Sequence, residues 1–482
     1  MDVHIHDLRS FIERLEDEKE LVRVKAEVDW KFEIGAIANR VFGPPPGPAL
    51  LFENIRGYSS PLFLGGLQTI RRIAIALELP AEIDHTRLVN EYMRRLTGKP
   101  IKPLRVKIGP CKENKYFNND VDIFKFPIPW LNEKDGGRYI GTWNSVVTKD
   151  PETGWTNVGT YRMEAHEKNV CGIHFAPFNH INLIYQKYVK VGKPMPIAVA
   201  IGNDPVIMLV SSSPFPAEVN EWDIAGTLRG RPLEVVEGET VDLEVPAFSE
   251  IVLEGEVLPL ERREEGPFGE HTGYYGGGRK PSPIMVVRCI THRNNPIFRC
   301  TYLRRPVDEE HQITAINHEA HALRMYTNCG FLGVTQVCFP AGGDPWFSAI
   351  IAVKKTYTSH AMDAARLLLS DKTGKFVKLV IVVDDDINVF DLNQVLWALN
   401  VRFQAGRDIC VFHNESGSIL DPSVPREVAG VTDKMIMDAT WPMTPDFRPV
   451  EEWDGNLHPP EVAPSEEIRR LIQNRWKEYG LE

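Results

Sequence analysis

The sequence predicts a multidomain protein that mixes helices and strands (α+β and α/β), and three observations support this fold class. The chain has 482 residues, the length of about three domains. Hydrophobic residues make up 43% and charged residues 25%, as in an ordinary globular protein. The hydrophobic pattern also changes along the chain, from a mixed first part to short strand-like runs and then to alternating helical and strand-like runs.

Residues 1–115 are expected to form an N-terminal α/β domain. Apolar residues from Leu8 to Leu15 recur at helical spacing, which predicts a helix over residues 7–18. A stretch rich in proline and glycine then precedes the strand-like run ALLFENI. The segment HTRLVNEYMRRL predicts a further helix.

Residues 116–305 are expected to form a central β-rich domain with a barrel or split-barrel architecture. Short apolar runs alternate here with turn residues, which is typical of such domains. The runs that we interpret as strands include IGTWNSVVT, HINLIYQKYV, MPIAVAIG, PVIMLVSS, EIVLEGEVL and IMVVRCITH.

Residues 306–455 are expected to form a C-terminal α/β domain with a partly parallel sheet, because helical segments such as HAMDAARLLLSD alternate with strand-like runs such as FVKLVIVV. Residues 456–482 contain a predicted amphipathic helix with Ser465 as its N-cap. One side of this helix carries Ile468, Leu471, Ile472 and Trp476. We expect that side to contact another subunit of an oligomer.

Charge and cysteine usage argue against several classes of protein. The net charge of −11 disfavours a nucleic acid or a membrane surface as the main partner. Seven cysteines without a CxxC pair favour a reducing compartment over a disulfide framework or a zinc ribbon. The N-terminus lacks the apolar core of a signal peptide, and runs such as LVIVV are far shorter than the about 20 residues that span a bilayer. We therefore expect a cytoplasmic protein without a membrane span.

Several common catalytic motifs are absent, namely GxSxG, GxxxxGK[ST], strand-GxGxxG-helix and HExxH. His318 and His321 lie close together in NHEAHALRMY, but their spacing is wrong for the zinc-binding helix of the zincins. We interpret them as a solvated or capping pair, with a metal site as the less favoured alternative.

Polar side chains gather in a stretch of the central part that we expect to be hairpin-like. Gly159 and Gly172 in this stretch allow close approach to the backbone. The polar residues are Asn157, Arg162, His174 and His180. Taken one at a time, each of them is more often structural than functional.

A second segment, VSSSPFPAEVNEWDIAGTLRG, places three serines between a strand-like run and a predicted helix. Serine hydroxyls and backbone amides ahead of a helix start suit a phosphate group. The helix carries Glu218, Glu221 and Asp223 near its start, and acidic residues there also stabilise a helix dipole without any ligand.

A third segment, REEGPFGEHTGYYGGGRK, sets Glu265 and Glu270 five residues apart around a Gly-Pro-Phe-Gly turn. A solvated charged turn is the usual interpretation of such a run. The alternative is the lip of an active site in which two carboxylates have different roles, with Gly276 to Gly278 allowing the lip to open and close.

In combination, the three segments can build one site. The oxygen and nitrogen ligands of Asn157, His180 and Glu221 suit a divalent ion such as Mn²⁺ better than zinc in a thiolate cage. Arg162 can hold a carboxylate with two parallel hydrogen bonds. A carboxylate beside an arginine stays ionised, whereas one in a drier pocket near a like charge has a raised pKa and can carry a proton, and we expect the two glutamates of the lip to differ in this way.

Seven motifs, in order along nearly the whole chain, make the sequence resemble the UbiD family of decarboxylases, which use prenylated FMN. They are NVGTYR, NHINLIYQK, EWDIAGTLRG, VPAFSEIVLEGEV, EEGPFGEHTGYY, VIVVDDDINVFDLNQVLWAL and DKMIMDAT. The length and the motif DLRSFIERLE resemble the branch that acts on hydroxyarylic and other aromatic acids. The resemblance implies three domains, of which the central one binds the flavin and is similar to flavin-reductase split barrels.

The resemblance also implies roles for individual residues. The ligands of Mn²⁺ fall on Asn157, His180 and Glu221, with K⁺ nearby to help hold the flavin phosphate. The other residues implied around the cofactor are Gly159, Thr160, Tyr161, Arg162, Asn179, Ser211 and Ser212.

The implied reaction is the reversible, non-oxidative decarboxylation of an aromatic, phenolic or α,β-unsaturated carboxylic acid, which releases CO₂. The catalytic Glu-Arg-Glu network of the family falls on Arg162, Glu265 and Glu270, with Glu270 as the proton donor. A separate flavin prenyltransferase would supply the cofactor, and homodimers or homohexamers are expected.

Three alternatives stay open. An aryl-CoA acid is an alternative substrate within the same family. A metal-dependent hydrolase could use His174, His180 and Glu221 around a water molecule, and it would contain no flavin. A non-catalytic flavoprotein or assembly subunit would tolerate the loss of Glu265 and Glu270, and the intact Glu-Arg-Glu set argues against it.

Overall fold

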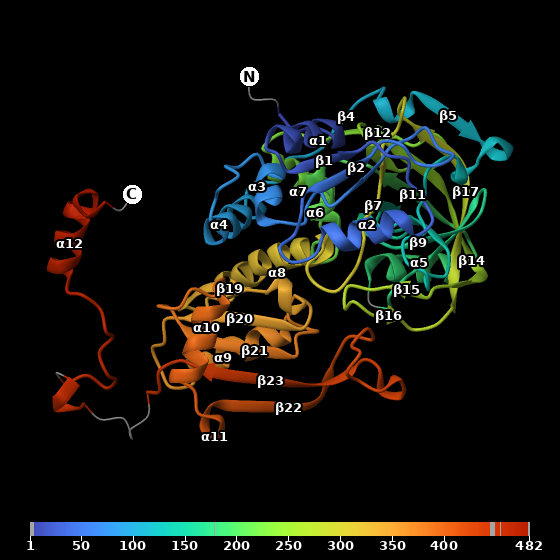
Figure 1. Ribbon diagram of the computed structural model, residues 1–482. Coiled ribbons are helices and arrows are strands. Elements are labelled where there is room, and N and C mark those ends of the chain that lie inside the picture. Colours follow the sequence, from blue (N-terminus) through green and yellow to red (C-terminus); the bar gives the residue numbers. More distant parts are fainter. Residues whose placement is uncertain (1–3, 178, 444–448, 454, 481–482) are drawn as a thin grey trace.

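The computed structural model describes residues 4–177, 179–443, 449–453 and 455–480. In Figure 1 the N-terminal elements and the large central sheet lie together, and the C-terminal sheet lies below them. Helices and strands are both present, and the strands form several separate sheets. The arrangement confirms the predicted mixed, multidomain fold class.

The N-terminal sheet has the order β1-β2-β3-β18. β1 (Leu21–Val24) is parallel to β2 (Ala49–Phe52), which is antiparallel to β3 (Leu62–Leu64). β18 (Phe298–Arg299) returns from the end of the central part and pairs with β3 in parallel. The helices of this part are α1 (Leu8–Asp17), α2 (Glu33–Val41), α3 (Ile70–Ala76) and α4 (His85–Leu96).

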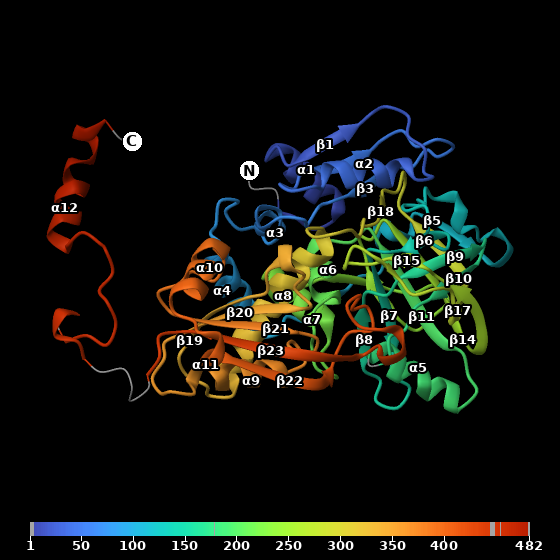
Figure 2. The ribbon, with the colours of Figure 1, turned by 60° about the horizontal axis from the view of Figure 1, so that its bottom comes forward.

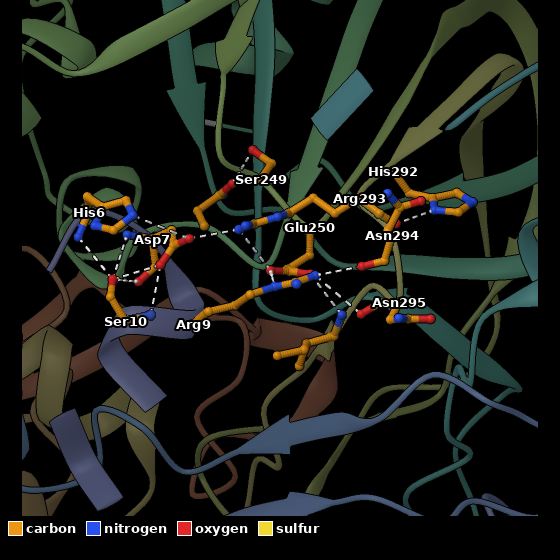
Figure 3. Close-up of polar contacts among 12 residues, drawn as sticks. His6, Asp7, Arg9, Ser10, Ser249, Glu250, His292, Arg293, Asn294 and Asn295 are labelled. Carbon is orange, nitrogen blue, oxygen red and sulfur yellow. Dashed lines mark hydrogen bonds and ion pairs between the residues drawn. The ribbon is translucent and has the colours of Figure 1, made fainter. Parts of the chain in front are cut away.

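A buried ion-pair network ties α1 to the central sheet (Figure 3). The Glu250 carboxylate is fully buried and accepts two hydrogen bonds from Arg9 of α1, each 2.8 Å long. Arg293 bridges Glu250 (3.2 Å) and Asp7 (2.8 Å), and Asp7 also caps α1. Because a buried carboxylate is strongly destabilising without such partners, the network fixes where α1 lies on the central sheet.

The central sheet has nine strands, in the order β6-β9-β10-β17-β14-β11-β7-β8 with β5 beside β17. Its longest strands, β14 (Ile251–Glu265) and β17 (Lys280–His292), form a hairpin whose end carries β15 (Phe268–Gly269) and β16 (Tyr275–Gly276). The remaining strands of the sheet are β5 (Asn114–Phe117), β6 (Arg138–Gly141), β7 (Asn144–Lys149), β8 (Thr156–Gly159), β9 (Met163–Glu167), β10 (Val170–Ile173) and β11 (Met195–Ile201). A separate small sheet contains β4 (Leu104–Arg105), β12 (Glu234–Glu237) and β13 (Glu244–Pro246).

Two runs that we interpret as strands in the sequence form helices instead. HINLIYQKYV forms α5 (His180–Lys190), whose buried residues Ile181, Ile184 and Tyr185 follow helical spacing. PVIMLVSS forms α6 (Pro205–Ser211), which is buried on all sides and therefore has no amphipathic pattern. The signal for α6 is local, because Asp204 caps the helix and proline occupies its first turn.

The C-terminal sheet has the order β19-β20-β21-β23-β22. The inner pairs β20–β21 and β21–β23 are parallel and both edge strands are antiparallel, which confirms the expected partly parallel sheet. The strands are β19 (Val334–Cys338), β20 (Ser348–Val353), β21 (Leu379–Asp384), β22 (Ile409–Ser416) and β23 (Val431–Ala439). The helices are α8 (Glu309–Asn328), α9 (His360–Ser370), α10 (Leu392–Val401) and α11 (Ala405–Asp408).

The two histidines of α8 differ from the expectation. His318 and His321 are buried. The ring of His318 contacts Phe339 and Trp346, and the ring of His321 contacts Phe215. Burial lowers the pKa of His318 to about 4 and that of His321 to about 3. They are therefore neutral packing side chains, neither solvated nor capping.

The last helix, α12 (Glu466–Arg475), stands apart from the rest of the chain in Figure 1 and Figure 2. Ser465 caps it as expected. None of its residues is buried, and Ile468 and Leu471 are 44% and 47% exposed. Within the described residues, no helix is long and apolar enough to cross a membrane.

Candidate active site

Arg162 joins the two glutamates of the third segment. It lies in the turn between β8 and β9, and its guanidinium donates to Glu265 from Nε (2.8 Å) and from Nη2 (3.1 Å). Its Nη1 contacts Oε1 of Glu270. Glu265 is 2% exposed and Glu270 is 7% exposed. Because the site is buried, these charge-assisted and bidentate hydrogen bonds fix the orientation of the three side chains.

Glu265, the last residue of β14, has the larger set of partners. Tyr139 donates its hydroxyl to Oε1 at 3.0 Å, and Nδ1 of His174 lies 3.7 Å from Oε2. Burial and the charge of Arg162 lower the pKa of His174 to about 4, so its imidazole is neutral at physiological pH. Nothing in the sequence marks Tyr139, because only the pairing of distant strands brings it to Glu265.

Glu270 makes fewer contacts than Glu265. Both glutamates contact Arg162. They differ in their other partners. Glu265 uses both of its oxygens and also binds Tyr139, whereas Glu270 contacts Arg162 through Oε1. The other oxygen, Oε2 of Glu270, makes no hydrogen bond to Arg162.

The lip that carries Glu270 (residues 266–276) is a small hairpin. β15 pairs with β16, and the Glu270 amide donates to the Tyr274 carbonyl at 3.0 Å. Asp135 fastens one side of the hairpin by accepting the Gly269 amide at 2.8 Å. Burial raises the pKa of Asp135 to about 6. Gly276 belongs to β16 and packs against the side chain of Glu270.

Gly276→Ala is expected to displace Glu270 and to lower kcat by about 10–100-fold, because small misplacements of reacting groups have effects of this size. A Cβ at Gly276 would lie 2.6 Å from Cγ and 2.8 Å from Oε1 of Glu270. Gly278 has nothing within 4 Å of the same position, so Gly278→Ala is the matched control. Steady-state kinetics of both variants test this, and equal kcat values would show that Glu270 tolerates the displacement.

The three predicted metal ligands lie on adjacent elements. Asn157 on β8 and Glu221, the first residue of α7 (Glu221–Arg229), are 3.4 Å apart between Nδ2 and Oε1. His180 begins α5, and α5 and α7 both contact β8. The ring of His180 packs edge-on against Trp155, whose indole nitrogen donates to the Val219 carbonyl just before α7. The expected hairpin is therefore limited to β9 and β10, with Asn157 on an earlier strand and His180 on a helix.

Lys372 approaches this group from the C-terminal part, and no sequence pattern identified it. Its Nζ donates to the Phe215 carbonyl at 2.7 Å. Burial, together with the charge of Lys372, lowers the pKa of His180 to about 4. Burial raises the pKa of Glu221 to about 8, although Lys372 opposes the shift. The site thus holds a neutral imidazole and a carboxyl group without full charge compensation.

The two serines expected near a phosphate have different surroundings. The hydroxyl of Ser211 donates to the Ile207 carbonyl at 2.7 Å and is buried. The hydroxyl of Ser212 lies 3.3 Å from that of Thr160, and the Thr160 amide donates to the Ser211 carbonyl at 3.2 Å. Ser212 and Thr160 are therefore the pair whose hydroxyl groups meet beside the Arg162 turn.

The remaining predicted cofactor residues have local roles in the described fold. A Cβ at Gly159 would lie 2.5 Å from the Tyr161 hydroxyl, so this glycine makes room for the buried Tyr161 ring. Asn179 is the N-cap residue of α5, without a hydrogen bond from its side chain to the helix. Its amide group is therefore not needed to cap the helix.

The ligand set of the hydrolase alternative does not come together. Among the histidine, cysteine, aspartate and glutamate side chains that the structure describes, no group of three with ligand atoms within 4.8 Å of one another includes His174, His180 or Glu221. His174 instead faces Glu265. The geometry therefore disfavours a water-activating centre built from these three residues.

Three sequence profiles of one family match the chain. They describe the N-terminal, the Rift-related and the C-terminal domain of 3-octaprenyl-4-hydroxybenzoate carboxy-lyase (UbiD). They match residues 12–95, 102–306 and 311–439.

Curated relatives and solved structures agree with these matches. A phenolic acid decarboxylase of Sedimentibacter hydroxybenzoicus is 36% identical, over 97% of this chain and 98% of the relative. The vanillic acid decarboxylase of the same organism, in its closed form, is 34% identical with a TM-score of 0.89 over 99% of both chains. An evolved dimeric form of the UbiD-class enzyme HmfF from Pelotomaculum thermopropionicum, in complex with prFMN, is 33% identical with a TM-score of 0.79, over 91% of this chain and 95% of that one.

Proposed function

The chain belongs to the UbiD family of carboxy-lyases and is a decarboxylase, and from this premise we propose that it removes CO₂ from a phenolic or other aromatic acid with prenylated FMN as cofactor. The observation that carries the proposal is the buried network of Glu265, Arg162 and Glu270. Relatives named phenolic acid and vanillic acid decarboxylase support the substrate class. An α,β-unsaturated acid and an aryl-CoA acid are the alternatives.

The donor set fits the proposed Mn²⁺. An amide oxygen (Asn157), a carboxylate (Glu221) and a neutral imidazole (His180) are ligands that this ion accepts. The raised pKa of Glu221 reflects burial without a full positive partner, and a bound cation would provide one. Ser211 and Ser212 would hold the flavin phosphate and K⁺, the cationic Lys372 would pair with the phosphate, and the HmfF complex with prFMN supports the flavin.

The side chains of the network would divide the work of the reaction. When bound, prenylated FMN supplies the electron sink that loss of CO₂ from an sp² carbon requires. Arg162 and Glu265 orient the substrate and keep water out. Glu270 delivers a proton from Oε2 to the carbon that CO₂ leaves, and it then takes up a new proton from solvent. Such an acid contributes about 10²–10⁴-fold to the rate.

We also propose that the chain forms homodimers or homohexamers and receives its cofactor from a separate flavin prenyltransferase. The apolar side of α12 supports an oligomer, since none of the helix residues is buried in one chain and Ile468 and Leu471 are 44% and 47% exposed. The dimeric form of HmfF is a further support.

Protein co-expressed with a flavin prenyltransferase is expected to show a flavin-like absorbance band under anaerobic conditions and to release a small molecule with the mass of prenylated FMN. It should release CO₂ from vanillic acid and similar phenolic acids. Glu221→Gln should lose bound Mn²⁺ and most of the flavin, because the substitution removes the anionic ligand. Asp223→Asn, on the same helix, is the matched control and should keep both.

Two results would contradict the proposal. A colourless protein that binds Mn²⁺ but no flavin would show that prenylated FMN is not the cofactor, and the proposed chemistry would be wrong. If protein that contains prenylated FMN turns over acrylic or aryl-CoA acids but no phenolic or other aromatic acid, the proposed cofactor would stand. The proposed substrate class would be wrong.

A further inference from the structure

The turn that follows Glu270 is fastened to the C-terminal part of the molecule. Nδ1 of His271 lies 3.0 Å from Oδ2 of Asp344, which precedes β20. His311, in the first turn of α8, donates from Nε2 to the backbone carbonyl of His271 at 2.8 Å. All three side chains are buried. We call His271, His311 and Asp344 the lip clamp.

The two histidines of the lip clamp, together with Glu310, also resemble a metal site, but the hydrogen bonds of His311 argue against one. Ligand atoms of His271, Glu310 and His311 lie within 4.8 Å of one another. A carbonyl oxygen only accepts hydrogen bonds, so Nε2 of His311 carries a proton. Its Nδ1 lies 2.8 Å from Oδ1 of Asp308. Neither nitrogen of His311 is free for a metal while it holds the turn.

The carboxylates around the lip clamp favour protonated histidines. Burial alone would lower the pKa of His271, but Asp344 and Glu310 outweigh burial and the repulsion from His311, and they raise it. Burial also opposes the charge on His311, yet Asp308, Glu310 and Asp344 raise the pKa of His311 to about 9. The charged groups that face His271 are therefore two carboxylates and one imidazolium.

We propose that protonated His271, held by Asp344 and assisted by His311, is a positioning residue that keeps Glu270 against Arg162. The proposal rests on the proposed proton delivery by Glu270. Inside the hairpin, the Gly273 amide donates to the Glu270 carbonyl at 2.9 Å, which closes the turn. This bond sets the shape of the turn but not its place in the molecule. The lip clamp fixes that place through His271, in addition to the bond from the Gly269 amide to Asp135.

The lip clamp should weaken as the pH rises. The folded-state pKa of His271 is raised, so its contribution is complete below the usual value of about 6.5 and is lost as the pH passes the raised value. Protection of the lip from hydrogen exchange should therefore fall as the pH rises through this raised pKa, after correction for the intrinsic exchange rate.

Asp344→Asn tests the lip clamp with little other change. Asp344 has a φ of +63°, a conformation that asparagine tolerates well. Its Oδ1 accepts the Trp346 amide at 3.1 Å, and an asparagine oxygen can do the same. The matched control is Asp433→Asn, since Asp433 pairs with His413 at 2.8 Å on the edge of the same sheet, where both side chains are exposed.

Hydrogen exchange of the lip in the cofactor-free protein gives the first readout. In Asp344→Asn, residues 266–276 should exchange about tenfold faster than in the wild type near neutral pH, whereas strand β20 should not change. In the wild type the same loss should appear only once the pH rises through the raised pKa of His271. In the loaded enzyme, kcat should fall about tenfold with KM changed less than about twofold, and the alkaline limb of the kcat profile should move to lower pH.

A second variant separates charge from hydrogen bonding. In His271→Asn, the side-chain amide takes the place of Nδ1 and can still donate to Asp344, but it does not titrate. Its lip should stay partly protected, and this protection should not depend on pH. The proposal would be wrong if residues 266–276 exchanged at the wild-type rate in Asp344→Asn. It would also be wrong if their protection in His271→Asn still depended on pH. Hydrogen exchange is measured without turnover. A protein without decarboxylase activity would therefore contradict the proposed function, and the lip clamp could still be tested.

Discussion

Glu270→Gln is expected to bind flavin and metal like the wild type but to lose turnover by about 10²–10⁴-fold, the contribution of a positioned acid. Glutamine has nearly the same size, and its amide oxygen can still accept from Nη1 of Arg162, so the lip should keep its place. The amide group has no acidic proton for the carbon that CO₂ leaves. The loss should therefore appear in kcat rather than in substrate binding.

The measurement is CO₂ release per bound flavin, with Glu264→Gln as the matched control. Glu264 lies next to Glu265 on β14, and its side chain faces solvent. The control should keep wild-type kcat and flavin content. Near-normal turnover by Glu270→Gln would mean that another group supplies the proton, and the role assigned to Glu270 would be abandoned.

Arg162→Lys is expected to lower kcat/KM by about 10²-fold although it keeps the positive charge. The guanidinium of Arg162 reaches Glu265 through two nitrogens and Glu270 through a third. A single ammonium group cannot make the bidentate contact and hold the second glutamate at the same time. Both carboxylates would then lose their fixed orientation.

Arg263→Lys is the control for this substitution, since Arg263 pairs with Glu167 where both side chains are partly exposed. Exposed pairs contribute about 0–1 kcal/mol, so this variant should match the wild type in activity and in thermal unfolding. Comparable kcat/KM values for Arg162→Lys and Arg263→Lys would show that only the charge at Arg162 matters.

Elements with a one-sided apolar pattern were predictable from the sequence. The helix from Leu8 to Asp17 has its apolar residues on one face, and the structure buries that face. The same logic failed for α6, because a helix buried on all sides has no periodic pattern. For α5 the pattern is present, because Ile181, Ile184 and Tyr185 recur at helical spacing, and the strand interpretation of this run is wrong.

The candidate site was predictable only in part, and the reason is distance along the chain. Arg162, Glu265 and Glu270 stand in recognisable motifs, and the structure brings them into contact. Tyr139 and Lys372 stand in no motif. Each becomes part of the site only because strand pairing or the packing of the C-terminal part brings it close to a buried carboxyl group.

The sequence by itself determined the family, the mixed fold class and the types of side chain available for the chemistry, because motifs and hydrophobic periodicity are local properties of the chain. The tertiary structure alone decided which charges meet. It gave the two glutamates on Arg162 different further contacts, set Lys372 near Glu221, and fastened His271 to Asp344. Burial and charge contacts set the pKa of a group, and both depend on neighbours that lie far away in the sequence.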